Sequence, residues 1–264
     1  AQFDAMTTAQ LRAISTAALA GLDSADFAAL GTARLQALSS DQMGALSSVQ
    51  LNALSTAQVR ALSSAQLDGL SAAELDSLST DRIAALSAAQ LGSLSTAQMA
   101  GLTADIAVLS STQLNGLTSS AIAALGTALP SADILTLGNV GMSGLTTAQF
   151  DTITSTAALA SLSAAQVAAL NTAVIASLSA AEVTALTSTQ MRALTGDQMR
   201  ALGADITAVE NSDLQALGAA QIAALTTAQA AALTAGQLGA LTNAQVQALT
   251  AAQLAAMGSN INSF

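Results

Sequence analysis

An eight-residue repeat fills nearly the whole chain, and its period restricts the possible folds more than any other feature. Typical units are Ser-Ser-Ala-Gln-Leu-Asp-Gly-Leu at 63–70 and Ser-Thr-Ala-Gln-Met-Ala-Gly-Leu at 95–102. We label the eight positions of this octad a to h. Position a is Ser or Thr, c is usually Ala, d is usually Gln, e is aliphatic or Met, g is Ala, Gly or Ser, and h is nearly always Leu. Such self-similarity predicts many stacked copies of one small unit.

One continuous helix does not fit this period. Eight residues turn an α-helix by about 800°, so the e and h side chains would drift by about 80° with each repeat. Within about five repeats the apolar stripe would have passed right round the helix, and it would face no single core. The octads therefore require a break in every repeat.

A short helix in each octad satisfies the pattern. Ser or Thr at position a is a favoured N-cap, and Gln three residues later completes a capping box. In the stretch 54–59, Ser55 and Gln58 are this pair, and Leu54 and Val59 stand where a hydrophobic staple joins the residue before the cap to the fourth helical residue. We therefore expect a helix of about six residues, spanning about 9 Å, in each octad.

The faces of such a helix indicate how the octads stack. Positions e, h, b and d share one side, which we expect to face a core, and c, f and g lie opposite. Small residues at c and g would let neighbouring backbones approach closely, while the variable position f (Arg12, Gln36, Asp68) is expected to face solvent. One octad buries too little apolar surface to fold alone. The predicted fold is an all-α solenoid of very short capped helices.

A β-solenoid is the alternative fold, because short repeats with aligned Leu residues also build stacked strands. Strands favour β-branched and aromatic residues, whereas Ala, Leu, Gln and Met favour helix. Aromatic residues make up 2% of this chain, and the octads are rich in Ala, Leu and Gln. Composition therefore favours the helical solenoid.

Three units are one residue short and share an Asp directly before an Ile. They are 103–109 with Asp105, 131–137 with Asp133, and 203–209 with Asp205. We interpret these carboxylates as tighter helix caps, with a shared ion or partner site as the alternative. Residues 154–162 instead carry one extra residue.

The segment 126–130 is the one candidate boundary, since it interrupts the octads and contains Pro130, the only proline. It is too short for a flexible interdomain linker. We therefore predict an octad array over 1–125, a proline-containing break at 126–130, and a continuation of the same array over 131–264.

Composition argues against several functional classes. The net charge is −10, and the six basic residues are all Arg and form no patch, so the sequence does not favour nucleic acid or anionic lipid as a partner. No stretch of about 18 apolar residues is present, so we expect no membrane insertion. The chain has no His, Cys, Lys or Tyr, which removes the usual nucleophile and zinc-ligand sets. We predict that the protein is not an enzyme.

The remaining acidic residues fit structural roles. Asp68, Asp76 and Glu182 stand at f or d of regular octads, where a solvated or capping carboxylate is expected. Asp23 and Asp26 could resemble calcium ligands, but they occupy a and d and are interpreted as a capping pair. We therefore predict no catalytic, cofactor-binding or metal-binding residue, and no cofactor.

Two further residue sets have structural explanations. Gly138, Gly141 and Gly144 follow a Gly-x-x-Gly-x-x-Gly spacing, but no phosphate-binding Lys follows them, so their expected role is conformational. Methionines such as Met43, Met99 and Met191 occupy position e and are expected to fill the core.

The sequence given begins and ends inside the repeat, because Ala1 enters at position c and Phe264 stands at h. Solenoids usually carry polar caps at their ends. We expect either that the array continues beyond these residues or that its ends bury each other between subunits.

The phrases Leu-Ser-Thr-Ala-Gln-Val and Leu-Thr-Ala-Ala-Gln-Leu resemble the Ala/Ser/Thr-rich octads of very large secreted surface proteins of Gram-negative bacteria, of the adhesin or haem-utilisation/adhesion type. This resemblance implies secretion and surface attachment. The predicted function is an extracellular structural protein that self-assembles into a filament or forms a rigid adhesin stalk, with copies of itself and a cell or abiotic surface as partners. An ice-binding or carbohydrate-binding module with repeated Ser/Thr rows is the alternative.

Overall fold

The computed structural model describes residues 5–153 and 155–263, apart from the side chains of Ser259 and Ser263. Within these ranges all regular structure is helical, and the α-helices are four to seven residues long. Most begin at a Ser or Thr N-cap in extended conformation, as Ser55 does for the helix that follows it. The predicted all-α solenoid is confirmed, and the β-solenoid alternative is wrong, since none of these residues lies in a strand.

The chain divides into two compact units, Ala1–Pro130 and Ser131–Phe264, and each is a solenoid of octads. The first ends in a short 3-10 helix that opens at Gly126, whose φ of 52° is in the left-handed region favoured by glycine. The proposed continuity of one array across the break stays a prediction.

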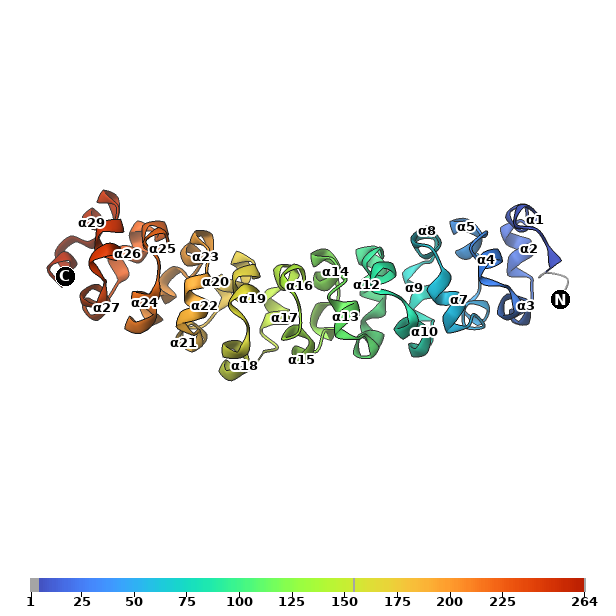
Figure 1. Cartoon of the computed structure of the whole chain (residues 1–264), viewed down its shortest axis with the longest axis horizontal. Helices are drawn as coiled ribbons and strands as arrows, with labels where there is room; N and C mark the ends of the chain where they lie inside the picture. The colour runs from blue at the N-terminus through green and yellow to red at the C-terminus, as the bar shows by residue number, and fades with distance from the viewer. Residues whose placement is uncertain (1–4, 154, 264) are drawn as a thin grey trace. The chain divides into compact units, whose positions relative to one another are not determined.

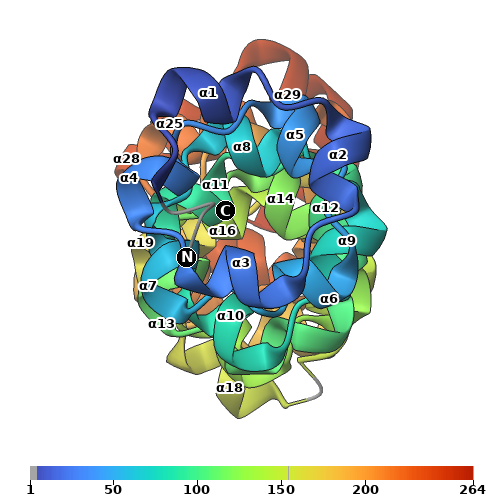
Figure 2. The same ribbon diagram turned by 90° about the vertical axis from the view of Figure 1, so that its right-hand side faces the viewer.

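In the first unit the short helices follow one another around a common axis (Figures 1 and 2). Its elements are α1 (Thr8–Arg12), α2 (Thr16–Ala20), α3 (Ser24–Ala29), α4 (Thr32–Leu35), α5 (Ser40–Met43), α6 (Ser48–Leu51), α7 (Thr56–Ala61), α8 (Ser64–Asp68), α9 (Ala72–Asp76), α10 (Thr80–Ala85), α11 (Ala88–Gly92), α12 (Thr96–Gly101), η2 (Leu102–Val108), α13 (Ser111–Leu114), α14 (Ser119–Ala124) and η3 (Gly126–Ala128).

The second unit has the same construction. Its elements are α15 (Ser131–Ile134), α16 (Asn139–Gly144), α17 (Thr147–Phe150), α18 (Thr156–Ser161), α19 (Ala164–Ala169), α20 (Thr172–Ser177), α21 (Ala180–Ala185), α22 (Ser188–Ala193), α23 (Gly196–Ala201), η4 (Gly203–Ala208), α24 (Asn211–Ala216), α25 (Ala219–Ala224), α26 (Thr227–Ala232), α27 (Ala235–Ala240), α28 (Asn243–Ala248), α29 (Ala251–Met257) and η5 (Gly258–Ser263).

The core of each unit consists of the e and h side chains together with Gln at d. Around Ser55, Val59 at e and Leu54 at h of the preceding octad are each 1% exposed, and Gln58 at d is 4% exposed. Thr56 at b and Ala57 at c are exposed. The prediction that b faces the core is therefore wrong, because b is the first helical residue and lies at the outer rim of the coil. The predicted core role of Met43, Met99 and Met191 is confirmed by full burial.

Close backbone approach occurs at positions f and g. A Cβ on Gly69, at position g, would lie 2.2 Å from the carbonyl oxygen of Ser40, and one on Gly44, at position f, would lie 2.3 Å from that of Gly69. Such contacts are too short for any side chain. The predicted role of small residues at g is confirmed, but at c it is wrong, since Val49 at c is 68% exposed.

Candidate functional site: the glutamine ladder

The side chain of Gln58 joins two helices that are far apart in sequence. Its Oε1 accepts a hydrogen bond from the backbone N–H of Ser55 at 2.7 Å, and the Ser55 Oγ accepts one from the Gln58 backbone N–H at 3.3 Å. Its Nε2 donates to the carbonyl oxygens of Phe27 and Leu30, both at 2.8 Å. One amide therefore caps the N-terminus of its own helix α7 and the C-terminus of α3.

The same arrangement recurs through both units, and we call it the glutamine ladder. In the regular octads Nε2 reaches the e carbonyl 31 residues earlier and the h carbonyl 28 residues earlier, which places the acceptor four octads back. The ladder is formed by Gln42, Gln50, Gln58, Gln66, Gln90, Gln98, Gln113, Gln166, Gln190, Gln198, Gln221, Gln229, Gln237, Gln245 and Gln253. Buried carbonyls that a helix end leaves open thus receive a donor.

Arginine replaces glutamine in two rungs of the ladder. Arg34 and Arg82 also stand at d, and the Nε of Arg82 donates to the carbonyl of Leu54 at 2.8 Å, 28 residues earlier. The Nε of Arg34 makes the equivalent bond to Met6 at 3.1 Å. These two arginines are therefore coil-to-coil donors.

A second set of contacts joins octads that are three apart. At position f, Gln36 donates to the carbonyl of Ala61 at 2.7 Å and Asn52 donates to that of Ser77 at 2.6 Å, both over 25 residues. The sequence predicts only that position f faces solvent. These f side chains also form hydrogen bonds between neighbouring coils. Because each octad bonds to octads three and four further on, one turn of the solenoid contains between three and four octads.

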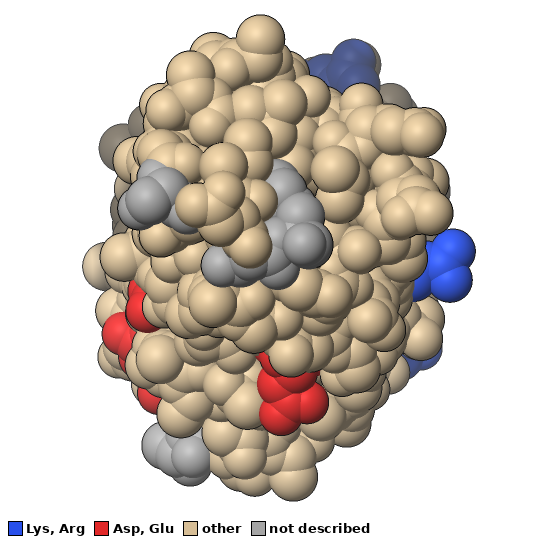
Figure 3. All heavy atoms as spheres, turned by 90° about the vertical axis from the view of Figure 1, so that its left-hand side faces the viewer, with Lys and Arg blue, Asp and Glu red and all other residues tan. Residues whose placement is uncertain are grey.

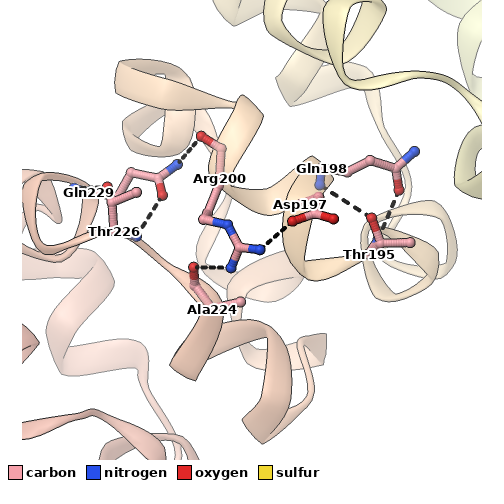
Figure 4. Close-up of polar contacts among 7 residues, drawn as sticks. All are labelled: Thr195, Asp197, Gln198, Arg200, Ala224, Thr226 and Gln229. Carbon is pink, nitrogen blue, oxygen red and sulfur yellow. Dashed lines mark hydrogen bonds and ion pairs between the residues drawn. The ribbon is translucent and has the colours of Figure 1, made fainter.

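Arg200, in the second unit, takes part both in a position-f contact and in a contact of the glutamine ladder (Figure 4). Arg200 forms an ion pair with Asp197 in its own helix, and its Nη1 donates to the carbonyl of Ala224 at 3.3 Å, three octads on. Its own carbonyl accepts a bond of 3.3 Å from Nε2 of Gln229, a ladder residue whose Oε1 accepts the Thr226 N–H at 2.9 Å. Charged residues here reinforce the stacking of coils.

The carboxylates behave less uniformly than predicted. Asp23 is the N-cap of α3, but its side chain accepts no capping hydrogen bond. The interpretation of Asp23 and Asp26 as a capping pair is therefore wrong. By contrast, Glu74 and Glu182 at position d do complete capping boxes. Glu182 Oε2 accepts the Ser179 N–H at 2.8 Å.

The three short units fold in two ways. The units of Asp105 and Asp205 form the 3-10 helices η2 and η4, which are tighter than α-helices, whereas Asp133 lies in the α-helix α15. Among the described residues, η2 and η4 have no side-chain cap, so the prediction of a cap is wrong at Asp105 and Asp205, and at Asp133 it stays a prediction. The extra residue, Thr154, lies outside the described residues.

Asp105 differs from the other acidic residues in its surroundings. It is 9% exposed, and burial raises the pKa of its carboxyl above the usual 3.8, with a smaller contribution from the negative charge of Asp76. It occupies the d position, where most octads have an amide donor. An ionised carboxylate cannot replace that donor.

The expected conformational role of the glycines at 138–144 is wrong for Gly138, whose backbone conformation any residue adopts. Gly138 is the N-cap of α16, and Gly141 is buried within it. The φ of Gly138 is −76°, which any residue adopts, so this segment is an ordinary octad helix.

Open hollows lie on the second unit. One is lined by Leu238, Gly239, Leu241, Asn243, Val246 and Gln247, and another by Gly203, Ala204, Thr226, Ala228, Gln229 and Ala232. Over the described part of the chain, no three acidic side chains lie close enough to hold a metal ion. No helix within that part is long and apolar enough to cross a membrane.

The ladder and the stacked octads define the class of protein: it is an α-helical repeat protein of the solenoid type. Residues 19–56, 48–80 and 206–243 match the family model of the ALTTAQ repeat. The six letters of that name occur at 224–229, where they run from position g to the ladder residue Gln229. No curated protein matches the chain. These six residues include the N-cap Thr226 and the ladder residue Gln229.

Proposed function

We propose that this protein is a non-catalytic extracellular structural protein, and that copies of it assemble into a surface filament or form a rigid adhesin stalk. The observation that carries the proposal is the glutamine ladder, in which every rung ties one coil to the coil before it. Buried hydrogen bonds that recur with each coil resist bending and local opening. Such a construction suits a load-bearing rod.

The absence of catalytic side-chain types in the sequence supports a non-catalytic role. The chain has no His, Cys, Lys or Tyr. Ser and Thr at position a, which could supply nucleophiles, accept backbone N–H groups of their own helices, as Ser55 does from Gln58. The carboxylate beside one of them, Glu182, accepts a hydrogen bond from the Ser179 hydroxyl at 2.7 Å and belongs to the capping box of its helix.

Secretion and attachment to a cell or abiotic surface are proposed from the resemblance to large octad-repeat surface proteins. The scattered arginines and the net charge of −10 favour neither nucleic acid nor an anionic membrane as partner. Surface labelling and protease treatment of intact source cells test this part of the proposal. Labelling that occurs only after lysis would contradict it.

Negative-stain electron microscopy together with sedimentation velocity tests assembly. The proposal predicts elongated particles whose length grows with protein concentration. A single monomeric species over the whole concentration range would rule out the filament, and a compact flexible particle would rule out the stalk.

The alternative, an ice- or carbohydrate-binding module, is favoured by one observation. Position b hydroxyls such as Thr8, Thr32 and Thr56 are exposed, so Ser/Thr rows do face solvent. The hydroxyls at position a are already engaged in caps, which leaves one row rather than two for a ligand. Thermal hysteresis and a glycan-binding screen test this alternative, and null results in both remove it.

A further inference from the structure

One rung of the first unit has oxygen atoms where the ladder elsewhere has a donor. Asp105 stands at d of the short unit that forms η2, and the octad four units earlier has Leu75 at e and Leu78 at h, 30 and 27 residues before it. Gln221, whose span also includes a short unit, donates to the carbonyls at the same two separations, at 2.9 and 2.8 Å. The ladder geometry therefore directs the Asp105 carboxylate to the carbonyl end of α9.

These oxygen atoms have no hydrogen-bond donor. Among residues 5–153 and 155–263, no side chain donates to the carbonyl of Leu78, and no group donates to the carboxylate of Asp105. Leu78 is 6% exposed and Asp105 is 9% exposed. Neither carboxylate oxygen of Asp105 is fully enclosed, because the described chain has no fully buried side-chain oxygen without a partner. Buried acceptors that retain a narrow opening to solvent indicate a partner that the chain does not supply.

Asp76 brings a second carboxylate to the same place. It is the last residue of α9, at position f of the octad that contains Leu75 and Leu78. η2 packs against α9. Burial raises the pKa of Asp105, and the negative charge of Asp76 raises it further, so the two carboxylates interact. Their repulsion and the open carbonyl together call for a positive charge.

No basic side chain of the described residues supplies that charge. Arg82 lies on α10, which also packs against η2, but its guanidinium donates to the Leu54 carbonyl and to the Ser79 hydroxyl. Charged side chains are sparse elsewhere: they make up 8% of the sequence, and uncharged residues form most of the face that Figure 3 shows outside the grey atoms. A cation therefore meets few competing carboxylates.

We propose that the carboxylates of Asp105 and Asp76 bind a calcium ion together with the carbonyl oxygen of Leu78, so that the ion replaces the missing ladder donor. Ca²⁺ takes about six to eight oxygen ligands from carboxylates, backbone carbonyls and water in a flexible geometry, so a third carboxylate is not needed. Water can complete the set, because Asp76 is exposed. Mg²⁺ requires a stricter octahedral arrangement and is less suited to this site.

The sequence predicts no metal-binding residue, with a shared ion site at the short units as the alternative, and the oxygen atoms around Asp105 favour that alternative for this one unit. The site goes beyond the proposed structural function and does not depend on self-assembly.

Two other aspartates at d lack this combination of ligands. Four octads before Asp205 the residue at f is Ala176, and four octads before Asp213 it is Thr184. Asp213 also accepts a hydrogen bond from the Ser188 hydroxyl. Asp205 is the better control, because its short unit has the same Ala-Asp-Ile sequence and also forms a 3-10 helix.

Isothermal titration calorimetry with CaCl₂ tests the site on the full chain after treatment with a chelator. We expect a single Ca²⁺ per chain. Asp105→Asn and Asp76→Asn should each weaken binding by about 10–100-fold or more, since loss of an outer partner of a metal ligand already has an effect of that size. Asp205→Asn should bind Ca²⁺ as the wild type does. Circular dichroism establishes that each variant is folded.

Thermal melting provides a second readout. Without metal, Asp105→Asn should melt above the wild type, because it removes a buried charge that has no partner. With saturating Ca²⁺ the wild type should gain stability, and this difference should shrink or reverse. The melting temperature of Asp105→Asn should not respond to Ca²⁺.

Three results would overturn the proposal. The first is a wild type that binds no Ca²⁺. The second is Asp105→Asn binding as tightly as the wild type, which is expected if an acidic chain attracts divalent ions without a specific site. The third is loss of binding in Asp205→Asn, which would place the ion at the other short unit. None of these results bears on self-assembly.

Discussion

Nε2 of Gln98 lies 2.7 Å from the carbonyl oxygen of Leu70, 28 residues earlier in the chain. The same amide donates to Leu67 at 2.8 Å, and its Oε1 accepts the N–H of Ser95 at 2.8 Å. A single buried side chain, 4% exposed, thus satisfies groups from two helices. Loss of the donor leaves buried carbonyls unpaired, and such groups are costly.

Replacing a ladder glutamine by glutamate should separate its two functions. Gln58→Glu keeps the acceptor for Ser55 but turns a carboxylate toward the carbonyls of Phe27 and Leu30. We expect a loss of about 2–4 kcal/mol in the free energy of unfolding. Thermal melting followed by circular dichroism measures it. Gln10→Glu is the matched control, because Oε1 of Gln10 accepts the Thr7 N–H at 2.8 Å while its Nε2 donates to no carbonyl of the described residues. At a concentration where the protein is monomeric it should change the melting temperature little; equal losses in both variants would show that the carbonyl bonds contribute nothing.

Removing an N-cap hydroxyl should have a smaller effect. The Ser55 Oγ accepts the Gln58 backbone N–H at 3.3 Å, so Ser55→Ala is expected to cost about 1 kcal/mol. Thr56→Ala, one residue later, removes an exposed hydroxyl with no capping role and should leave stability unchanged or slightly increased. Urea denaturation of the three proteins compares them, and a larger loss in Thr56→Ala would contradict the assignment of the cap.

Adding one methyl group where backbones meet should be strongly destabilising. Gly69→Ala would place its Cβ 2.2 Å from the Ser40 carbonyl oxygen, so neighbouring coils must separate, at a cost of about 1–3 kcal/mol or more. In Gly21→Ala the nearest atom to the new Cβ is the Ala18 carbonyl oxygen at 3.6 Å, an ordinary contact. The melting temperature should fall in the first variant only. Unchanged stability in Gly69→Ala would mean that this close approach does not exist.

Stability should fall as the carboxyl of Asp105 ionises. Burial, and to a lesser extent Asp76, raises its folded pKa above the unfolded value of 3.8, so the folded state binds the proton more tightly. The penalty is absent below the unfolded pKa, grows as pH rises toward the folded pKa, and is complete above it. Asp105→Asn should therefore be more stable than the wild type at neutral pH, and the difference should shrink in acid.

Melting curves from acid to neutral pH measure this difference. Asp76→Asn, which removes the smaller cause, should recover only part of the stability gained by Asp105→Asn. A stability difference between wild type and Asp105→Asn that does not vary with pH would contradict the explanation.

Local features of the fold could be predicted from the sequence. The pairing of Ser55 with Gln58 is a capping signal within four residues, and the apolar period places Leu54 and Val59 in the core. These predictions depend only on neighbours along the chain. The repeat length alone excluded one long helix.

The coil-to-coil contacts could not be predicted in the same way. The acceptors of Gln58 are 28 and 31 residues away, and nothing near Gln58 indicates how many octads form a turn. The contact between Gly69 and Ser40 likewise depends on that number. Without the number of octads in a turn, the place of b on its own helix predicts that b faces the core, although the first turn of each helix lies at the outer rim of the coil. For the same reason the sequence predicts a cap at Asp105, although its carboxylate stands where most octads have the ladder amide.

Hydrogen exchange of the glutamine side-chain amides tests the ladder most directly. Nuclear magnetic resonance can follow the Nε2 protons, with assignments from single Gln→Glu variants. The Nε2 protons of Gln58, Gln66 and Gln98 should exchange slowly, since they are buried and bonded to carbonyls four octads away, while those of Gln10 should exchange rapidly. Equal and rapid exchange at all four residues would contradict the ladder.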